Sequence, residues 1–238
     1  MTGSTLSAST QHSLDFVTES LACLKACRIL EIGCGAGALA AALAASGPDV
    51  VAIDGDEAEV ARVRQLGVDA RVATWPSFDD GRFDAILFTR SLHHVDDLQA
   101  SVDAAFAALR SGGRLIVEDF RAEGGTERSD IWFASLARLL DAADLLVDPA
   151  SHLCYILGGG DAHEDHTHDL HSSAAIRHAI GQRDAAVREE DTAYYFRYFE
   201  PVSKASPLPG RVLHHEFDLI AAGAIDALGY RLVAERRG

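Results

Sequence analysis

The feature that most constrains this chain is an apolar strand that runs straight into a glycine-rich turn. The apolar segment Arg28–Ile32 is followed by Gly33, Gly35 and Gly37, and an alanine-rich stretch comes next. Glycine has no Cβ, so it can adopt positive φ and lets a ligand approach the backbone closely. A second apolar segment, Val50–Asp54, ends in a carboxylate. This order of strand, glycine turn, helix and acidic strand end indicates a nucleotide-binding crevice at the carboxyl edge of a parallel sheet.

Two classes of ligand are compatible with such a crevice. Ala38 completes the looser G-x-G-x-x-A pattern of dinucleotide-binding proteins, in which an acidic residue follows about 20 residues later, as Asp54 does. Glu31 lies two residues before the first glycine. It favours a cationic or amine-bearing ligand, because a carboxylate attracts a cation and repels a pyrophosphate.

With Glu31, the turn resembles the first motif of the class I S-adenosylmethionine (SAM)-dependent methyltransferases, an acidic residue followed by G-x-G-x-G. The resemblance covers residues 28–120 and includes Phe83–Phe88, as the fourth strand, and Leu109–Val117, as the turn into the fifth. It implies a Rossmann-like α/β fold with a seven-stranded sheet, mostly parallel with an antiparallel last strand, helices on both faces and an inserted helical cap. It also implies S-adenosyl-L-methionine as cofactor and S-adenosyl-L-homocysteine (SAH) as product.

The resemblance further implies which residues form the cofactor site. Asp54 would bind the ribose hydroxyls, and Glu31 would act near the amino group of SAM. Many family members have an acidic residue for the adenine after the third strand, where this chain has Thr74 and Trp75. Trp75 could stack on the base or cover the core. The predicted cofactor-binding residues are Glu31, Gly33, Gly35, Gly37, Asp54, Thr74, Trp75 and Thr89.

The alternation of apolar and amphipathic segments predicts a parallel sheet with helical crossovers. The expected strands are residues 28–32, 49–54, 69–74, 83–89, 113–119, 185–190 and 229–235. The expected helices are residues 11–26, 36–46, 57–66, 96–110, 126–147, 173–182 and 211–228. We expect Ser111–Gly113 to end the helix at 96–110. We expect Pro207 and Pro209 to break the aromatic segment that precedes the helix at 211–228.

A length of 238 residues fits one domain with an elaboration. We expect an N-terminal lead-in with a helix over the site (1–26) and a SAM-binding core (27–120). A substrate-covering insertion (121–182) and C-terminal strands and a helix that complete the sheet (183–238) are expected to follow.

Composition narrows the choice of partner and compartment. The net charge of −15 disfavours nucleic acid and anionic membranes, both of which bind basic surfaces. No apolar run approaches the roughly 20 residues that span a bilayer, and the polar N-terminus does not read as a secretory signal. Four cysteines without disulfide or zinc spacing suit a reducing cytoplasm. We expect a cytoplasmic protein with a small-molecule substrate, either a monomer or a homodimer.

Histidines provide the candidates for a catalytic base, because imidazole titrates near neutral pH. His93 and His94 follow the fourth strand, at the corner that in the family faces the methionine end of SAM. His94 could instead help Asp96 to shape the start of the next helix. A histidine-rich segment over residues 161–171 offers a further candidate base, His168. Histidines of that segment with a spacing suited to zinc or iron are His166, His168 and His171; the segment could equally be a solvated loop.

Tyr195 and Tyr198, in an aromatic segment, could line a substrate pocket or pack in the core. The predicted reaction is methyl transfer from SAM to an oxygen or nitrogen of a small molecule, by in-line displacement in a dry site. One alternative is a non-methylating protein of the same fold that keeps SAM as a ligand or uses a histidine-bound metal. The others are an NAD(P)-dependent oxidoreductase and an interaction module with vestigial SAM binding.

Overall fold

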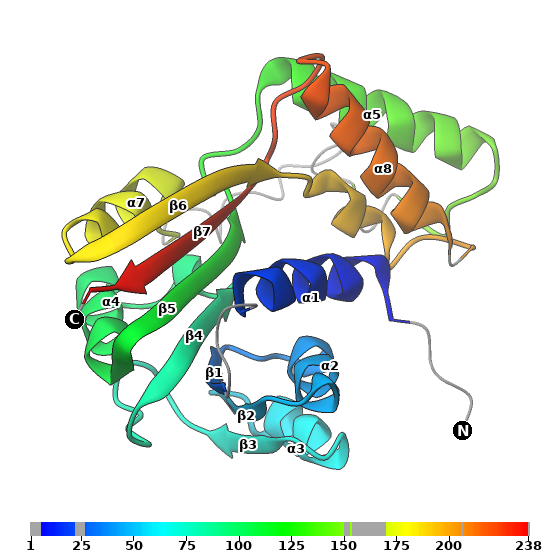
Figure 1. Cartoon of the computed structure of the whole chain (residues 1–238). Coiled ribbons are helices and arrows are strands. Elements are labelled where there is room, and N and C mark those ends of the chain that lie inside the picture. The colour runs from blue at the N-terminus through cyan, green and yellow to red at the C-terminus, as the bar shows by residue number, and fades with distance from the viewer. Residues whose placement is uncertain (1–5, 22–26, 150–152, 154–169, 206, 238) are drawn as a thin grey trace. The chain divides into compact units, whose positions relative to one another are not determined.

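A seven-stranded sheet forms the framework of the structure (Figure 1). This computed structural model describes residues 6–21, 27–149, 153, 170–205 and 207–237. The sheet order is β3-β2-β1-β4-β5-β7-β6; the pairs from β3 to β5 are parallel and the last strands are antiparallel. The strands are β1 (Arg28–Ile32), β2 (Asp49–Asp54), β3 (Asp69–Val72), β4 (Phe83–Thr89), β5 (Leu109–Phe120), β6 (Ala185–Thr192) and β7 (Gly229–Arg236). The predicted fold class is confirmed, and β7, the last strand, lies between β5 and β6.

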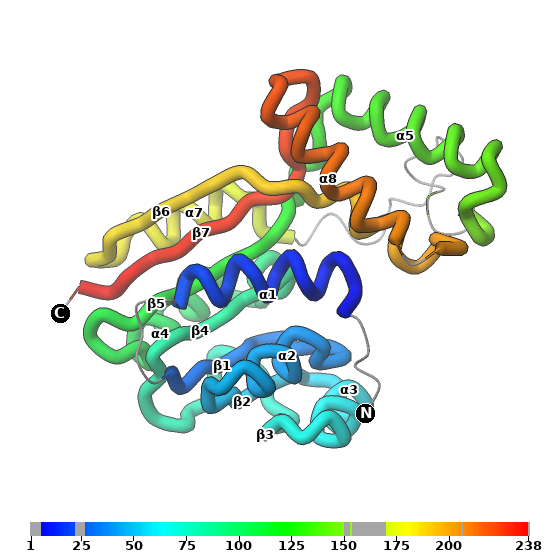
Figure 2. Tube along the Cα trace, turned by 45° about the vertical axis from the view of Figure 1, so that its right-hand side comes forward, coloured from blue at the N-terminus to red at the C-terminus, as the bar shows by residue number. Residues whose placement is uncertain are grey.

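Helices connect the strands and cover both faces of the sheet. In Figures 1 and 2, α2 and α3 lie together on one face and α4 and α7 lie together on the other, and each of these pairs is in contact. The helices are α1 (Ala8–Leu21), α2 (Ala38–Ser46), α3 (Glu57–Gln65), α4 (Leu98–Ala108), α5 (Glu127–Ala142), α7 (Ser173–Gly181) and α8 (Pro207–Ala221), with short 3₁₀ helices η1 (Leu92–His94) and η2 (Tyr195–Phe199). None of these described helices has the length and apolar character of a membrane span.

The boundary between α4 and β5 lies earlier than the sequence suggests. α4 ends at Ala108, and β5 begins at Leu109, which is fully buried and pairs with Phe83. The register then shifts before Ala85, and Gly112 takes a φ of 73° in this irregular stretch. The expectation that Ser111–Gly113 ends the helix was therefore wrong. Burial of Leu109 against the sheet starts the strand first, and the glycine serves an irregularity within it.

The start of α8 also differs from expectation. The helix begins at Pro207 rather than at residue 211. The first N–H groups of a helix have no partner within it, so a residue without an N–H is tolerated in the first turn. Pro207 and Pro209 therefore lie in the first turn of α8, and the expected start of the helix at residue 211 was wrong.

One of two compact units comprises residues 12–119, 171–190 and the segment from Arg231. Its apolar core includes Phe16 from α1, Leu43 from α2 and Val60 from α3, packed with side chains of the sheet. α7 falls within the range 121–182 that we predict as an insertion, yet it belongs to this unit, where it contacts α4 and η1. The predicted division into domains stays a prediction.

The second unit comprises the segment up to Gln11 together with residues 120–170 and 191–230. It contains α5, η2 and α8, whose core includes Phe133, Phe196 and Phe199. Glu216, fully buried in α8, accepts hydrogen bonds from the backbone N–H groups of η2 and the residue before it, at 2.7 to 3.0 Å. Burial raises the pKa of Glu216 to about 7. This carboxyl group satisfies the backbone donors at the start of η2, which explains why it is buried.

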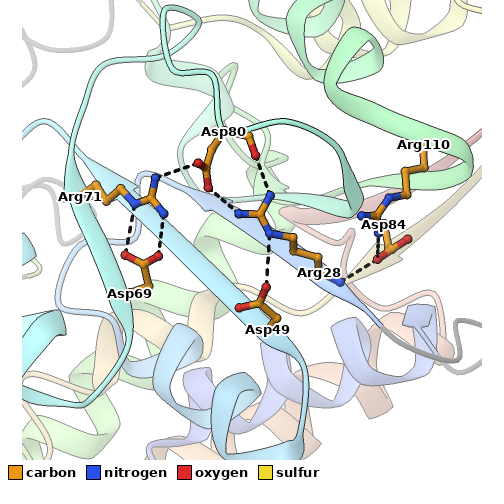
Figure 3. Close-up of polar contacts among 7 residues, drawn as sticks. All are labelled: Arg28, Asp49, Asp69, Arg71, Asp80, Asp84 and Arg110. Carbon is orange, nitrogen blue, oxygen red and sulfur yellow. Dashed lines mark hydrogen bonds and ion pairs between the residues drawn. The ribbon is translucent and has the colours of Figure 1, made fainter.

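Ion pairs join the amino ends of neighbouring strands (Figure 3). The glycine turn follows the opposite, carboxyl end of β1. The Arg28 guanidinium, at the start of β1, bonds to Asp80 at 2.5 Å and to Asp49 at 3.3 Å. Arg71 in β3 pairs with Asp69 at 2.7 Å and with Asp80 at 3.0 Å. The bonds from Arg71 lower the pKa of Asp69 and Asp80 below the usual range. Charges of both signs thus bridge the starts of β1, β2 and β3.

Candidate active site

The glycine turn after β1 has a backbone conformation that suits its composition. Gly33, Gly35 and Gly37 all have positive φ, at 72°, 48° and 73°. Residues with a Cβ rarely adopt such values. The amides of Gly33 and Cys34 donate to the carbonyl oxygen of Ile53 at 2.9 and 3.1 Å, which ties the turn to the end of β2. Backbone conformation therefore accounts for glycine at all three positions.

The three glycines differ in their surroundings. A Cβ on Gly33 would lie 2.7 Å from the Cβ of Ser91, and one on Gly37 would lie 2.4 Å from Cγ2 of Val63. Packing within the protein therefore requires these two glycines. A Cβ on Gly35 would meet nothing within 4 Å. At Gly35 the turn presents bare backbone to open space, where a ligand could approach it.

Asp54 lies beside this open space, at the carboxyl end of β2. Its Oδ2 accepts a hydrogen bond from the Gly35 amide at 2.9 Å, and its Oδ1 accepts one from the Asp56 amide at 2.9 Å. The two bonds fix the carboxylate next to the bare backbone of the turn. Asp56 in turn caps α3, accepting from the Ala58 amide at 2.7 Å. The Asp54 carboxylate is therefore held beside the glycine turn, and its contact with ribose hydroxyls stays a prediction.

Glu31 places a buried carboxylate near the same turn. The residue is 2% exposed, and its Oε1 accepts a hydrogen bond from Thr89 Oγ1 at 3.2 Å. Its Oε2 is buried and has no hydrogen-bond partner within the described part of the chain. Burial raises the pKa of Glu31 to about 7, although Thr89 and the charge of Arg90 act in the opposite direction. A buried oxygen without a donor is costly, so Oε2 is suited to accept from a ligand.

The two residues predicted near the adenine lie differently from each other. Thr74 is exposed, whereas Trp75 is half-buried. The indole N–H of Trp75 donates to the carbonyl oxygen of Ser101 in α4 at 3.1 Å, and its ring lies edge-on to Phe88 at 6.3 Å. These contacts are those of a side chain that covers the core, which was one of the two interpretations of Trp75. Adenine contacts of both residues stay predictions.

The corner after β4 brings a histidine and a carboxylate together. His93, in η1, is 3% exposed, and its Nδ1 lies 2.7 Å from Oδ1 of the fully buried Asp119 near the end of β5. A carboxylate at Nδ1 keeps the proton on that nitrogen and makes Nε2 the basic one. His94 is exposed, with its ring 4.1 Å from that of His93. At this corner a carboxylate therefore orients the ring of His93.

The backbone of this corner is held by neighbouring strands. Arg90 has a φ of 60°, which is uncommon for a residue with a side chain, and its amide donates to the carbonyl oxygen of Glu118 in β5 at 2.8 Å. The hydroxyl of Ser91 donates to the carbonyl oxygen of Ile32 in β1 at 2.6 Å. The chain thus turns sharply from β4 into η1 while bonded on both sides.

The histidine-rich segment is described only at its end. His168, the candidate base, and His166 lie outside the described residues. His171 donates from its backbone N–H to the carbonyl oxygen of His93 at 3.0 Å, and from ring Nε2 to the carbonyl oxygen of Val95 at 2.7 Å. Nε2 of His171 therefore acts as a hydrogen-bond donor. Among the residues that are described, no group of three or more His, Cys, Asp or Glu side chains is arranged to hold a metal ion.

The two tyrosines predicted to contact substrate belong to the aromatic core of the second unit. Tyr195 is 2% exposed, packs against Phe133 at 5.0 Å, and donates its hydroxyl to Asp130 at 2.6 Å. Tyr198 is half-buried and packs edge-on to Phe133 at 5.7 Å. This packing agrees with the core interpretation of the tyrosines, and substrate contact stays a prediction.

Two carboxylates of this structure escaped the sequence analysis. Asp119 comes near the end of the fifth strand, and the carboxyl ends of parallel strands meet at one edge of a sheet. That signal could have pointed to it. For Glu216 we find no such signal, because an acidic residue in an amphipathic helix is ordinarily exposed.

Comparison with known proteins decides the family. A family model described as a methyltransferase domain matches residues 10–159. The chain belongs to the methyltransferase domain family. A ubiquinone biosynthesis O-methyltransferase of Alkalilimnicola ehrlichii is 36% identical to this methyltransferase-family chain over 112 residues, 43% of this chain and 45% of the relative. A protein of the same name from Xylella fastidiosa is 32% identical over 176 residues, 70% of this chain and 65% of the relative. The chain thus spans about half to two thirds of the length of these relatives.

Solved structures agree on the fold of this methyltransferase-family chain. Magnesium protoporphyrin IX methyltransferase from Synechocystis, crystallised with SAH, has a TM-score of 0.56 and 17% identity. The superposition covers 96% of this chain and 84% of that one. At 17% identity the likeness supports the Rossmann-like methyltransferase fold. It assigns no role to individual residues of the site.

Proposed function

We propose that this chain transfers the methyl group of SAM to a hydroxyl oxygen of a small molecule. The observation that carries the proposal is the bare, open backbone at Gly35 beside the fixed carboxylate of Asp54. The buried Oε2 of Glu31 adds an acceptor for a cationic donor. Together they suit a ligand that carries both sugar hydroxyls and an ammonium group. The relatives named O-methyltransferases support oxygen as the acceptor atom.

The residues fit SAM through complementary hydrogen bonding. Asp54 would accept from the ribose hydroxyls, and Oε2 of Glu31 would accept from the ammonium group or from a water bound to it. Thr74, Trp75 and Thr89 are the remaining predicted contacts of the cofactor. When bound, SAM would supply a methyl carbon made electrophilic by the adjacent sulfonium.

His93 is the base that this chain offers to a hydroxyl acceptor. An alcohol or phenol must lose its proton as its oxygen becomes a nucleophile, and Nε2 of His93 would take that proton. Asp119 would hold the ring in the required tautomer and stabilise the imidazolium that results. His94 and His168, which the sequence also predicts as candidate bases, remain predictions. A thiol acceptor would need the base least, because thiols ionise near neutral pH.

Calorimetry with SAM and SAH tests the cofactor site. We expect the wild-type chain to bind both, and Gly35→Ala to weaken SAH binding at least about tenfold, because its Cβ would occupy the ligand's space. The same variant should unfold with a free energy only about 1 kcal/mol lower, the cost of a Cβ at positive φ.

Gly37→Ala is the matched control, because its Cβ would strike Val63 rather than open space. It should lose more stability than Gly35→Ala. Absence of heat with both nucleosides, or unchanged SAH affinity in Gly35→Ala, would overturn the proposed cofactor site. Release of SAH across a panel of hydroxyl, amine and thiol acceptors then tests the acceptor class.

A further inference from the structure

The end of the histidine-rich segment contacts the turn that carries His93. His171 makes two hydrogen bonds to η1 and the residue after it. Its backbone N–H donates to the carbonyl oxygen of His93 at 3.0 Å, and its ring Nε2 donates to the carbonyl oxygen of Val95 at 2.7 Å. A carbonyl oxygen can only accept, so the proton of the ring lies on Nε2. One residue, far away in sequence, thus bonds to the main chain on both sides of His94.

The turn that receives these bonds is weakly held by its own backbone. η1 has only three residues. Its internal hydrogen bonds are long, at 3.2 Å from the His94 amide to Ser91 and at 3.5 Å from the Val95 amide to Leu92. The residue before Ser91 has an unfavourable φ. A short 3₁₀ turn of this kind depends on bonds from outside for a fixed conformation.

The element that supplies the bonds is firmly anchored. Ser172, the next residue after His171, caps α7 by accepting from the Ala175 amide at 3.2 Å. Within α7, Ile176 and Ile180 are buried. Just after the helix, Arg183 pairs with Asp103 of α4 at 2.7 Å. The two carbonyl groups of the turn are therefore bonded to a well-packed helix rather than to a loose loop.

We propose that His171 is a positioning residue, which fixes the backbone of η1 so that the ring of His93 meets Asp119. The inference rests on the proposed function in one respect, that His93 is the base for a hydroxyl acceptor. Displacement of a reacting group by about 1 Å can cost on the order of 100-fold in rate. The ring of His171 acts through the main chain of the turn and needs no contact with substrate. This role accounts for His171, one histidine of the histidine-rich segment, and requires no bound metal ion.

The test compares variants at position 171 by the state of the His93 ring. In ¹⁵N-histidine NMR spectra, the His93 signals are assigned by their absence in His93→Gln. We expect the neutral wild-type ring to carry its proton on Nδ1. His171→Phe keeps the ring volume but removes the donor, so the His93 tautomer mixture and titration midpoint should shift. His171→Gln places an amide donor near the position of Nε2 and should restore the wild-type signals. His171→Asn, whose amide is too short to reach Val95, should not.

Turnover adds a second readout where the acceptor panel yields a substrate. The donor-lacking variants should lose about 10- to 100-fold in kcat, with little change in the KM for SAM. His178→Phe is the matched control, because His178 lies exposed on α7 and bonds to Gln182 of the same helix end. If His171→Phe fails to fold, the contrast between Gln and Asn decides.

Unchanged His93 signals in both His171→Phe and His171→Asn would overturn the positioning role. Equal effects of Gln and Asn would also overturn it, since a purely structural role does not distinguish the reach of the donor. The proposed function fails separately, if the wild-type chain binds neither SAM nor SAH. The His93 spectra remain decisive in that case, because they need no ligand.

Discussion

At the scale of single residues, Glu31 is buried, has a raised pKa, and carries one oxygen without a hydrogen-bond donor among the described residues. Its pKa is raised from 4.5 to about 7 by burial, while Thr89 and Arg90 favour the charged form. A ligand ammonium that bonds to Oε2 would stabilise the carboxylate and so lower that pKa. Below about pH 7 the free protein therefore holds a proton on Glu31 that it must release when such a ligand binds.

We predict that SAH affinity falls as the pH is lowered from about 7.5 to 5.5, approaching a tenfold loss per pH unit at the lower end. Calorimetry in buffers with different ionisation enthalpies should detect release of nearly one proton at the lower pH. Glu31→Gln should bind more weakly but with no pH dependence over this range. Wild-type binding without proton release would refute the coupling.

The contribution of Glu31 to folding stability changes with pH in the opposite direction to SAH affinity. Because the folded pKa of Glu31 is raised, its contribution to the stability of the free protein is fully present below pH 4.5 and is lost as the pH rises through about 7. Bound SAH should therefore raise the melting temperature more at pH 7.5 than at pH 5.5.

Some residues of the candidate site could be predicted from the sequence, and others could not. Glycines and Asp54 could be assigned because their chemistry depends on local backbone geometry and on spacing along one crossover. The pairing of His93 with Asp119, and that of His171 with η1, joins segments that only the folded sheet brings together. Residue spacing along the chain does not show which of these side chains meet, although the order of the strands could have pointed to Asp119.

At the scale of elements, a buried ion pair joins α1 to the sheet. Glu118 of β5 is fully buried and bonds to Arg231 of β7, with Nε at 2.9 Å. Ser13 of α1 donates its hydroxyl to the other carboxylate oxygen at 2.5 Å, and Arg231 donates to the carbonyl oxygen of His12 at 2.8 Å. The guanidinium lies 4.4 Å from the centre of the Phe16 ring. Loss of the Arg231 charge would leave the Glu118 carboxyl group buried without its guanidinium partner.

We predict that Arg231→Met lowers the free energy of unfolding by about 3 to 5 kcal/mol, because the Glu118 carboxyl group stays buried without its guanidinium partner. The double variant Glu118→Gln with Arg231→Met should recover a substantial part of that loss. Urea denaturation of the single and double variants measures the coupling. Arg188→Met, which removes an arginine with an exposed side chain from β6, should change stability by about 0.5 kcal/mol or less. A cost for Arg231→Met as small as that of the control would show that the pair is dispensable.

The bounds of helices and strands were predicted well where the burial of apolar residues decides them. They were predicted poorly where contacts with neighbouring elements decide them. The strands at 28–32, 49–54 and 83–89 have the expected bounds, because apolar segments between turns have few other uses in a parallel sheet. The start of β5 depends on its pairing with Phe83, and the start of α8 on the tolerance of a first helical turn for proline. Both depend on context that local patterns do not contain.

At the scale of the whole molecule, the candidate site and a set of ion pairs occupy opposite edges of the same sheet. Gly35, Asp54 and His93 follow the carboxyl ends of their strands, whereas Arg28 and its partners lie at the amino ends (Figure 3). Because the candidate site and the ion pairs lie at different edges of the sheet, substitutions at one edge should have little effect on the other. The net charge of −15 gives the arginines at the amino edge a further role, since they offset repulsion among the surrounding carboxylates.

Arg28→Met tests this separation of edges. The variant loses the guanidinium bonds to Asp80 and Asp49, as well as a contact with the Phe83 ring at 4.6 Å. We expect a loss of about 1 kcal/mol in the free energy of unfolding at low salt, less at high salt, because the pairs are partly exposed and screened. SAH affinity should stay within about twofold of wild type, in contrast to Gly35→Ala. Arg62→Met, on the exposed side of α3, controls for removal of one positive charge. A large loss of SAH affinity in Arg28→Met, but not in Arg62→Met, would mean that the two edges of the sheet are coupled.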